Sequence, residues 1–199
     1  MFILRQGLTI PARQTIVMRM DVSDENLALS AAGGDMAAFS SLLERHYDRL
    51  FALCFRLTGQ NADAEDLTQD ICSALPGKLG GFRGESKFAT WLYRVAVNAS
   101  HDRRRRAETH RRAAEGWGDW EVARQAEIAE GREGMAWLTR AMATLPEDLR
   151  DTLALTLDEE LTHKQAAEAL GVSEGTVSWR LSEVRKRLKA LEAEETGNG

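Results

Sequence analysis

Apolar residues recur at three- and four-residue steps along most of the chain, which is the spacing of one face of an α-helix. The first such segment runs from Ala38 to Thr58 and stops before Gly59, a residue type that commonly terminates helices. Its apolar positions are Phe39, Leu42, Leu43, Tyr47, Leu50, Phe51, Cys54 and Phe55. The pattern predicts an amphipathic helix, and no alternating strand pattern competes with it along the chain.

Two more helices are predicted in the same half of the chain. One starts at Asp63, which we interpret as its N-cap, and runs toward Leu75 until Pro76-Gly77 ends it. The glycine-rich stretch GKLGGFRGES is then expected to form a loop. The next helix starts near Ser86 and runs into a block of arginines, with an apolar face of Phe88, Trp91, Leu92, Val95, Ala96 and Ala99.

The remaining segments divide the chain into two domains. Residues 107–133 are polar, acidic and weakly periodic, so we interpret them as a flexible linker with some helical content. Helices ending at Leu145-Pro146 and running from Glu147 to about Leu157 follow. The predicted architecture is all-α, with a disordered tail at residues 1–23, a first domain at 24–106, the linker, and a second domain at 134–195.

The stretch HKQAAEALGVSEGTVSWRLSEVRKRLKAL, residues 163–191, predicts a helix-turn-helix. Ala167 is the small residue where the two helices cross, and Gly171 can take the positive φ that the turn needs. Val172 is the apolar residue that fills the inside of the turn. Ser173 caps the second helix, whose buried face is Val177, Leu181, Val184, Leu188 and Leu191. The opposite, basic face lies where a DNA major groove would sit, although a plain hairpin with a solvated basic face is the alternative.

Charge supports the DNA interpretation because it is segregated along the chain. The net charge of −5 by itself argues against nucleic-acid binding. Residues 103–112, however, hold six arginines against one glutamate, and residues 174–189 hold five basic residues against two glutamates. Residues 113–133 between them hold six acidic residues and two arginines. Two basic helix ends therefore predict two separate contacts with phosphates.

The sequence contains no motif that indicates catalysis or the binding of a cofactor or metal. With 43% hydrophobic residues and only three prolines, it is typical of a helical globular protein. Cys54 and Cys72 lie in apolar patterns and are expected to be reduced core thiols of a cytoplasmic protein. Four scattered histidines form no zinc signature, and no phosphate-cradling loop or nucleophile elbow is present. We expect no enzyme, cofactor or metal, and no membrane contact, because no apolar run approaches about 18 residues.

Four stretches carry a resemblance to a known family: DAEDLTQDI, FRGESKFATWLYRVAVNASHDRRRR, LPEDLRDTLAL and AAEALGVSEGTVSWRLSEVRKRL. In this order and spacing, across nearly all of residues 25–191, the chain resembles the bacterial extracytoplasmic-function (ECF, group IV) RNA polymerase sigma factors. The resemblance implies sigma domain 2 followed by a helix-turn-helix sigma domain 4. It implies an alternative sigma factor that binds core RNA polymerase and directs promoter-specific transcription initiation, in a stress response and under an anti-sigma factor.

The resemblance also implies three sets of site residues. The β′ clamp helices of polymerase are expected to meet Asp66, Leu67, Gln69 and Asp70. The −10 promoter element is expected to meet Arg83, Ser86, Lys87, Tyr93, Arg94, Asn98, Arg103, Arg104, Arg105 and Arg106, with Tyr93 stacking on a flipped base. The −35 element is expected to meet Glu174, Thr176, Ser178, Trp179, Arg180, Ser182, Arg185, Lys186 and Arg187, while this domain rests on the β flap.

The chain departs from the family pattern at two positions of the second domain. Trp179 stands where a small polar residue is usual, and Glu183 replaces a frequent basic one, so the DNA preference is expected to differ from that of common members. A sigma mimic that sequesters an anti-sigma factor without binding DNA is the main alternative, but it needs no basic helix ends. A helix-turn-helix repressor leaves residues 63–106 unexplained.

Overall fold

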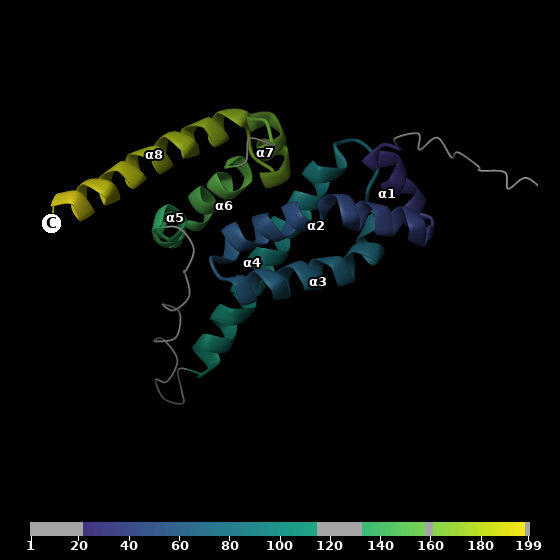
Figure 1. Cartoon of the computed structure of the whole chain (residues 1–199), viewed down its shortest axis with the longest axis horizontal. Helices are drawn as coiled ribbons and strands as arrows, with labels where there is room; N and C mark the ends of the chain where they lie inside the picture. The colour runs from purple at the N-terminus through teal and green to yellow at the C-terminus, as the bar shows by residue number, and fades with distance from the viewer. Residues whose placement is uncertain (1–21, 115–132, 158–160, 198–199) are drawn as a thin grey trace, which may run out of the picture.

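The computed structural model describes residues 22–114, 133–157 and 161–197, and within these ranges the regular structure is eight α-helices and no strand. The helices are α1 (Asp24–Ala32), α2 (Met36–Thr58), α3 (Asn61–Leu79), α4 (Phe88–Ala114), α5 (Glu133–Thr144), α6 (Glu147–Thr156), α7 (His163–Leu170) and α8 (Glu174–Gly197). The first four form one bundle and the last four a second, packed against it (Figure 1). The predicted all-α fold of two helical domains is confirmed.

Helix α2 is the central helix of the first bundle and matches its prediction closely. The carboxylate of Asp35 accepts hydrogen bonds from the backbone N–H groups of Ala37 and Ala38 at 2.9 and 3.1 Å, which starts the helix. Gly59 ends it in the left-handed conformation, at φ 79°, where its N–H bonds the carbonyl of Phe55. Apolar residues between these caps pack onto α3 and α4.

Helix α1 was not anticipated from the sequence, yet it organises one end of the first bundle. Asp24 in its first turn lies 2.7 Å from Arg45 and 2.8 Å from His46, which is buried in α2. Glu25 accepts a hydrogen bond from the backbone N–H of Phe88 at 3.3 Å. This carboxylate therefore meets an otherwise unpaired N–H at the start of α4 and fixes where that helix begins.

Helix α3 differs from its prediction at both ends. It begins at Asn61, so Asp63 lies in the first turn and is not the N-cap. Pro76 lies inside the helix, which continues to Leu79, so the expectation that Pro76-Gly77 ends it is wrong. Leu75 and Leu79 are both buried, and their packing holds the last turn although Pro76 removes one hydrogen bond from the surface side.

The second bundle contains the predicted helix-turn-helix in α7 and α8. Thr162 and Gln165 form a capping box at the start of α7, and Gly171 ends it at φ 67°. Ser173 accepts a hydrogen bond from the N–H of Thr176 at 3.1 Å, as expected of the cap of α8. Ala167 is 4% exposed and Val172 packs half-buried on the core, which confirms both structural expectations.

Several sequence expectations fall outside the described residues. Helix α4 continues to Ala114, so the segment predicted as a linker begins with helical residues. The rest of that segment, including Trp117 and Trp120, and the tail before residue 22 lie outside the described ranges. Among the helices that are described, none combines the length and apolar character needed to cross a bilayer.

Candidate functional site

An aromatic cluster anchors both ends of the glycine-rich loop between α3 and α4. The ring centroids of Phe82 and Trp91 are 5.5 Å apart, and those of Phe82 and Phe88 are 5.7 Å apart. His46 of α2 lies edge-on to Phe88 at 5.1 Å. Phe82 and Phe88 are buried, so the aromatic residues contribute to the core and hold the polar loop between them at the surface.

The polar residues predicted for the −10 element are accessible around this loop. Arg83, Lys87 and Asn98 are exposed, and Ser86 is half-buried. Arg83, Ser86 and Lys87 lie on the loop, and Asn98 lies further along in α4. The structure therefore leaves these four predicted residues accessible.

Tyr93 is placed differently from its prediction. Its side chain is 5% exposed and belongs to the hydrophobic core, so the expectation that it faces outward to stack on a base is wrong. Tyr93 lines a small pocket together with Leu161, which comes from the second domain. Periodicity within α4 could not reveal that a second domain covers this side of the helix.

The acidic face of α3 is exposed, except for its predicted apolar anchor. Asp66, Gln69 and Asp70 are accessible, as a contact with polymerase would require. Leu67 is 1% exposed and lies in the core with Ile71, four residues later on the same face of the helix. The structure therefore places Leu67 in the core and not on the accessible face, and its contact with polymerase stays a prediction.

Arg103, predicted to face DNA phosphates, pairs with this acidic face. Its guanidinium lies 2.8 Å from Asp63, 3.2 Å from Asp66 and 3.9 Å from Asp70. Burial opposes the positive charge, but the hydrogen bonds to Asp66 and Asp63 outweigh burial and raise the pKa of Arg103. The structure thus joins a predicted DNA contact to two predicted polymerase contacts.

Arg104 and its neighbour His101 instead reach the second domain. Arg104 donates to Glu147 at 2.9 Å and to Asp151 at 3.4 Å, and His101 Nε2 lies 2.6 Å from Asp151. Asp151 is only 2% exposed. Burial opposes ionisation of Glu147, but its contacts with Arg104 and His101 outweigh burial and lower its pKa. These four residues form an interdomain ion cluster, which sequence reasoning missed entirely.

The same cluster has the spacing of a metal site. The ligand atoms of His101, Glu147 and Asp151 lie within 4.8 Å of one another. Both carboxylates are already paired with the guanidinium of Arg104, whose positive charge would repel a divalent cation at this distance. The chemistry of the group is therefore satisfied by ion pairing between the two domains.

The last two residues of the RRRR run are the accessible cations. The side chain of Arg105 is 80% exposed and lies 4.0 Å from Asp102 one turn earlier, a contact that is weak at the surface. Arg106 is exposed as well. They are placed to meet an anionic partner without first breaking a buried contact.

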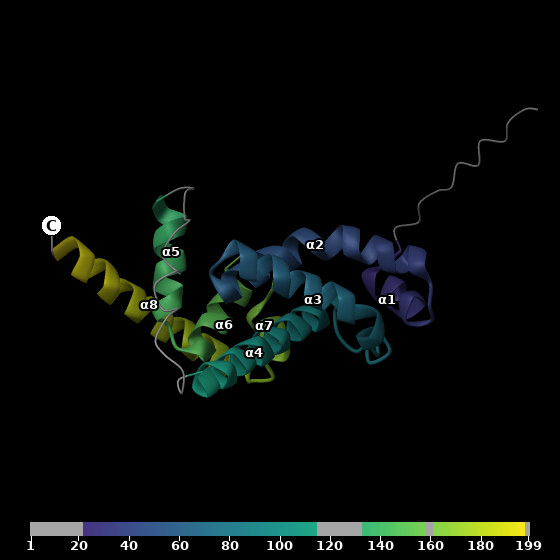
Figure 2. The same ribbon diagram turned by 90° about the horizontal axis from the view of Figure 1, so that it is seen from below.

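Helix α8 carries the exposed face predicted to read the −35 element. Its accessible members are Glu174, Ser178, Trp179, Ser182, Arg185, Lys186 and Arg187. Trp179 is 62% exposed, which is unusual for the largest apolar side chain and leaves it without a packing role. The C-terminal part of α8 extends away from the first bundle in both views (Figures 1 and 2).

Several residues of the predicted −35 set have partners within the second domain, including Ser178, whose hydroxyl lies 3.4 Å from His163 Nδ1, and Arg187, which pairs with Glu183 at 3.0 Å. The side chain of Arg180 is 16% exposed, lies 3.4 Å from Asp148 and donates to Thr152, so it ties α8 to α6. Thr176 shares a hydrogen bond with Ser173 at 2.8 Å as part of the helix cap. Arg180 therefore contributes to the fold of the domain, which the predicted role at the phosphates did not include.

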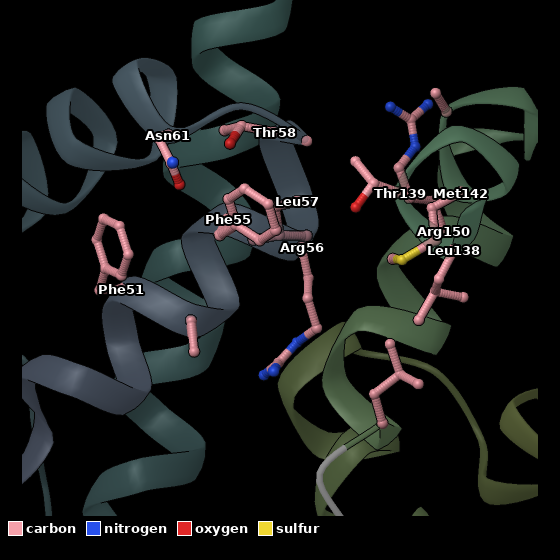
Figure 3. Close-up of a pocket in the computed structure, with 14 residues that line it drawn as sticks. Phe51, Phe55, Arg56, Leu57, Thr58, Asn61, Leu138, Thr139, Met142 and Arg150 are labelled. Carbon is pink, nitrogen blue, oxygen red and sulfur yellow. The ribbon is translucent and has the colours of Figure 1, made fainter. Parts of the chain in front are cut away.

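A pocket of about 480 Å³ lies between the two domains and was not anticipated. Phe51 and Phe55 of α2 stand on one side of it, and Leu138 and Met142 of α5 on the other (Figure 3). Each set fits an ordinary amphipathic helix in the sequence. Only the packing of the domains makes them the two walls of one apolar hollow.

Comparisons with known proteins match each half of the chain to a known family region. The family model for sigma-70 region 2 matches residues 42–110, and the model for sigma-70 region 4 matches residues 135–188. The first match covers most of α2, all of α3 and most of α4, and the second covers most of α5, all of α6 and α7, and most of α8. The two domains of the structure thus coincide with two family regions.

Individual relatives match over nearly the whole chain. The ECF RNA polymerase sigma factor SigM of Mycobacterium tuberculosis is 33% identical over 174 residues, which cover 87% of this chain and 86% of SigM. The solved structure of CnrH in complex with the cytosolic domain of CnrY has a TM-score of 0.65 and 26% identity, covering 86% of this chain and 97% of CnrH. RpoE of Bartonella quintana, solved with the anti-sigma factor NepR, shares the fold with a TM-score of 0.64 at 24% identity, over 77% of this chain and 95% of RpoE.

Proposed function

Because the chain belongs to the ECF RNA polymerase sigma factors, we propose that it is a group IV alternative sigma factor that directs core polymerase to particular promoters. It acts in the cytoplasm, in a stress response. One observation carries the proposal: each domain presents its own exposed basic surface, Arg105 and Arg106 on α4 and Arg185 and Lys186 on α8. A chain that only sequestered another protein would need neither surface.

The contact with polymerase is assigned to the exposed face of α3. Asp66, Gln69 and Asp70 offer carboxylate and amide groups to the β′ clamp helices. Tyr47 and Phe51 of α2 line a surface pocket with Gln69 and supply apolar area beside these polar groups. The second domain rests on the β flap. Polymerase performs the chemistry, and this chain contributes no catalytic group or cofactor.

The first domain is assigned to the −10 element. The loop before α4 brings Arg83, Ser86 and Lys87 to a base that leaves the stack, and Asn98 lies on the same helix. Arg105 and Arg106 hold phosphates, where binding is independent of sequence and falls with added salt. Arg103 and Arg104 join them once their internal ion pairs are released.

The second domain is assigned to the −35 element. Ser178, Trp179 and Ser182 approach base edges in the major groove, and Arg185 and Lys186 hold the flanking phosphates. Trp179 offers a large apolar surface where a hydroxyl would offer a hydrogen bond. Trp179 therefore favours contact with a thymine methyl group over contact with a hydrogen-bond donor or acceptor on a base edge.

An anti-sigma factor is the proposed regulator. The relative CnrH was solved in a complex with the cytosolic domain of another protein, CnrY. The apolar pocket between the domains suits the apolar face of an incoming helix, because Phe55 and Met142 leave room between their side chains (Figure 3). Filling this pocket would hold both domains at once.

The decisive experiment is transcription with purified core polymerase. We expect the intact chain to support promoter-dependent initiation and the double substitution Arg105→Ala with Arg106→Ala to lose most of it. The matched control, Arg105→Lys with Arg106→Lys, keeps both charges and is expected to retain initiation. An intact chain that binds an anti-sigma factor but never initiates would identify the sigma mimic instead.

A further inference from the structure

We propose that Glu25 of α1 is a positioning residue for recognition of the −10 element, because it holds the end of the loop that carries Ser86 and Lys87. Its carboxylate accepts a hydrogen bond from the backbone N–H of Phe88 at 3.3 Å, at the point where the loop ends and α4 begins. The inference deepens the proposed function and rests on it, since Ser86 and Lys87 are among the side chains assigned there to the −10 bases.

The start of α1 is fixed on α2 by three polar contacts. Arg45 donates to the carbonyl of Val22 at 2.8 Å and to one carboxylate oxygen of Asp24 at 2.7 Å. The other oxygen of Asp24 lies 2.8 Å from Nε2 of His46, which is 4% exposed. Charge-assisted hydrogen bonds of this length hold their partners in a defined geometry. Glu25 follows Asp24 directly, so its carboxylate is presented from a fixed position.

Phe88 is held at both its backbone and its side chain by residues outside α4. Glu25 meets the backbone N–H of Phe88, which has no partner within the helix because it belongs to the first turn. A carboxylate at this position also interacts favourably with the positive end of the helix dipole. The Phe88 ring is 1% exposed and lies edge-on to His46 at a centroid distance of 5.1 Å. The first residue of α4 therefore has little freedom to shift while α1 stays in place.

The loop before Phe88 depends on such anchors because its own side chains are mostly accessible. Arg83 and Lys87 are exposed, and Ser86 is half-buried. Lys87 and Glu25 border the same hollow of about 430 Å³ beside the start of α1. A segment with few buried contacts takes its shape from the places where it is fixed. Losing the hydrogen bond to Glu25 would thus let Ser86 and Lys87 move with the loosened start of α4.

A displaced loop would affect the choice of base more than the overall strength of DNA binding. Hydrogen bonds to base edges weaken steeply when their distance or angle changes, whereas contacts with phosphates carry no sequence information. The phosphate contacts are assigned to Arg105 and Arg106, which lie toward the other end of α4. Glu25 is therefore expected to act on the preference at −10 bases and not on the general affinity for DNA.

The test uses the full-length chain assembled with core polymerase. The probe is a pool of forked DNAs whose single-stranded −10 bases are randomised, and sequencing of the bound fraction gives the preference at each position. Glu25→Ala removes the acceptor, whereas Glu25→Gln keeps an oxygen that can accept the same hydrogen bond. Glu44→Ala, which removes an exposed carboxylate from α2, is the matched control. Hydrogen exchange of the Phe88 amide in the free chain reports on the hydrogen bond itself.

We expect Glu25→Ala to reduce the preference for the favoured base about fivefold at one or two −10 positions, the size expected for a lost helix-cap hydrogen bond. The average affinity for the pool and the affinity for a −35 duplex should change by less than about twofold. The Phe88 amide should exchange faster in Glu25→Ala alone, and Glu25→Gln and Glu44→Ala should keep the natural preference. An unchanged preference in Glu25→Ala would overturn the inference, as would an equal loss in Glu25→Gln or a similar loss of −35 binding.

The same measurements separate this inference from the proposed function. If the natural chain selects bases from the pool and initiates transcription, and Glu25→Ala selects the same bases equally well, the proposed function stands and the role of Glu25 is refuted. If the natural chain selects no base at any −10 position and never initiates transcription, the proposed function and this inference are refuted together, whatever the exchange rate of the Phe88 amide.

Discussion

Arg103 and Asp63 lie 2.8 Å apart, and this pair ties the arginine run of α4 to the first turn of α3. Asp66 and Asp70 on the next turns of α3 complete a row of carboxylates along the same guanidinium. The basic run is therefore not uniform. Arg103 holds two helices of one domain together, Arg104 holds the two domains together, and Arg105 is directed to solvent.

We predict that Arg103→Ala lowers the free energy of unfolding by about 1 kcal/mol, because three carboxylates on α3 lose their common partner. Arg105→Ala should leave stability unchanged, since its side chain is 80% exposed. Urea unfolding followed by circular dichroism measures both. Equal stability of the two variants would show that the α3–α4 ion pairs contribute nothing.

We predict that the same Arg105→Ala variant weakens binding to DNA. Loss of one phosphate contact lowers the slope of log affinity against log salt by about 1, with little change in sequence preference. Titration of a −10 fork over a range of salt concentrations measures the slope. A change in base preference without a change in slope would place Arg105 at a base and not at a phosphate.

Trp179→Ala is predicted to change −35 sequence preference more than it changes binding to core polymerase. The side chain is 62% exposed and is not part of the buried core, so its removal should leave the fold intact. Binding to a library of −35 duplexes and to core polymerase are the two measurements. Trp91→Ala serves as a contrast, because that indole packs in the aromatic cluster and its loss should lower stability. Equal losses in both assays would contradict the assignment of Trp179.

Asp24 is predicted to make the first domain sensitive to acid. Burial raises its pKa, but hydrogen bonds and charge contacts with Arg45 and His46 outweigh burial, so the pKa lies below its usual value of 3.8. A carboxyl group whose pKa is lowered by folding stabilises the fold at pH values above its usual pKa. This contribution is lost as the pH falls through the lowered pKa of the folded state.

Asp24→Asn should therefore be less stable than the natural chain at neutral pH, and the difference should shrink as the pH falls from about 5 to about 3. Thermal unfolding at several pH values measures it. Asp48→Asn, at an exposed position of α2, is the charge-matched control. A difference that is independent of pH would mean that Asp24 acts through shape and not through its charge.

Gly171 is predicted to tolerate alanine poorly, because its φ of 67° is a conformation that side chains disfavour. Gly171→Ala should destabilise the second domain by about 1 kcal/mol. Gly77→Ala, in a helical position of α3 with no atom within 4 Å of the added Cβ, should be neutral or stabilising by up to about 1 kcal/mol. Chemical denaturation compares the two. Identical effects would indicate that the turn relaxes around the new side chain.

Local rules explain which elements could be predicted. Helix α2 and its end at Gly59, and the turn from Gly171 to the cap at Ser173, depend on residues within a few positions of each other. Such local contacts can be recognised from the spacing of the residues along the sequence. Pro76 shows the limit of the same rules, because burial of Leu75 and Leu79 carries α3 past a residue that normally ends a helix.

The sequence by itself determined the helices from α2 to α8 apart from the exact ends of α3, the division into two domains and the exposed polar faces of α3 and α8. Only the tertiary structure decided which members of those faces are available. Tyr93 and Leu67 are covered, and Arg104 meets Asp151 across 47 positions of the chain. Helix periodicity reports which residues share a face, but a face is buried by whatever element packs on it. The partners of a charge are chosen by that packing, which no spacing along the chain records.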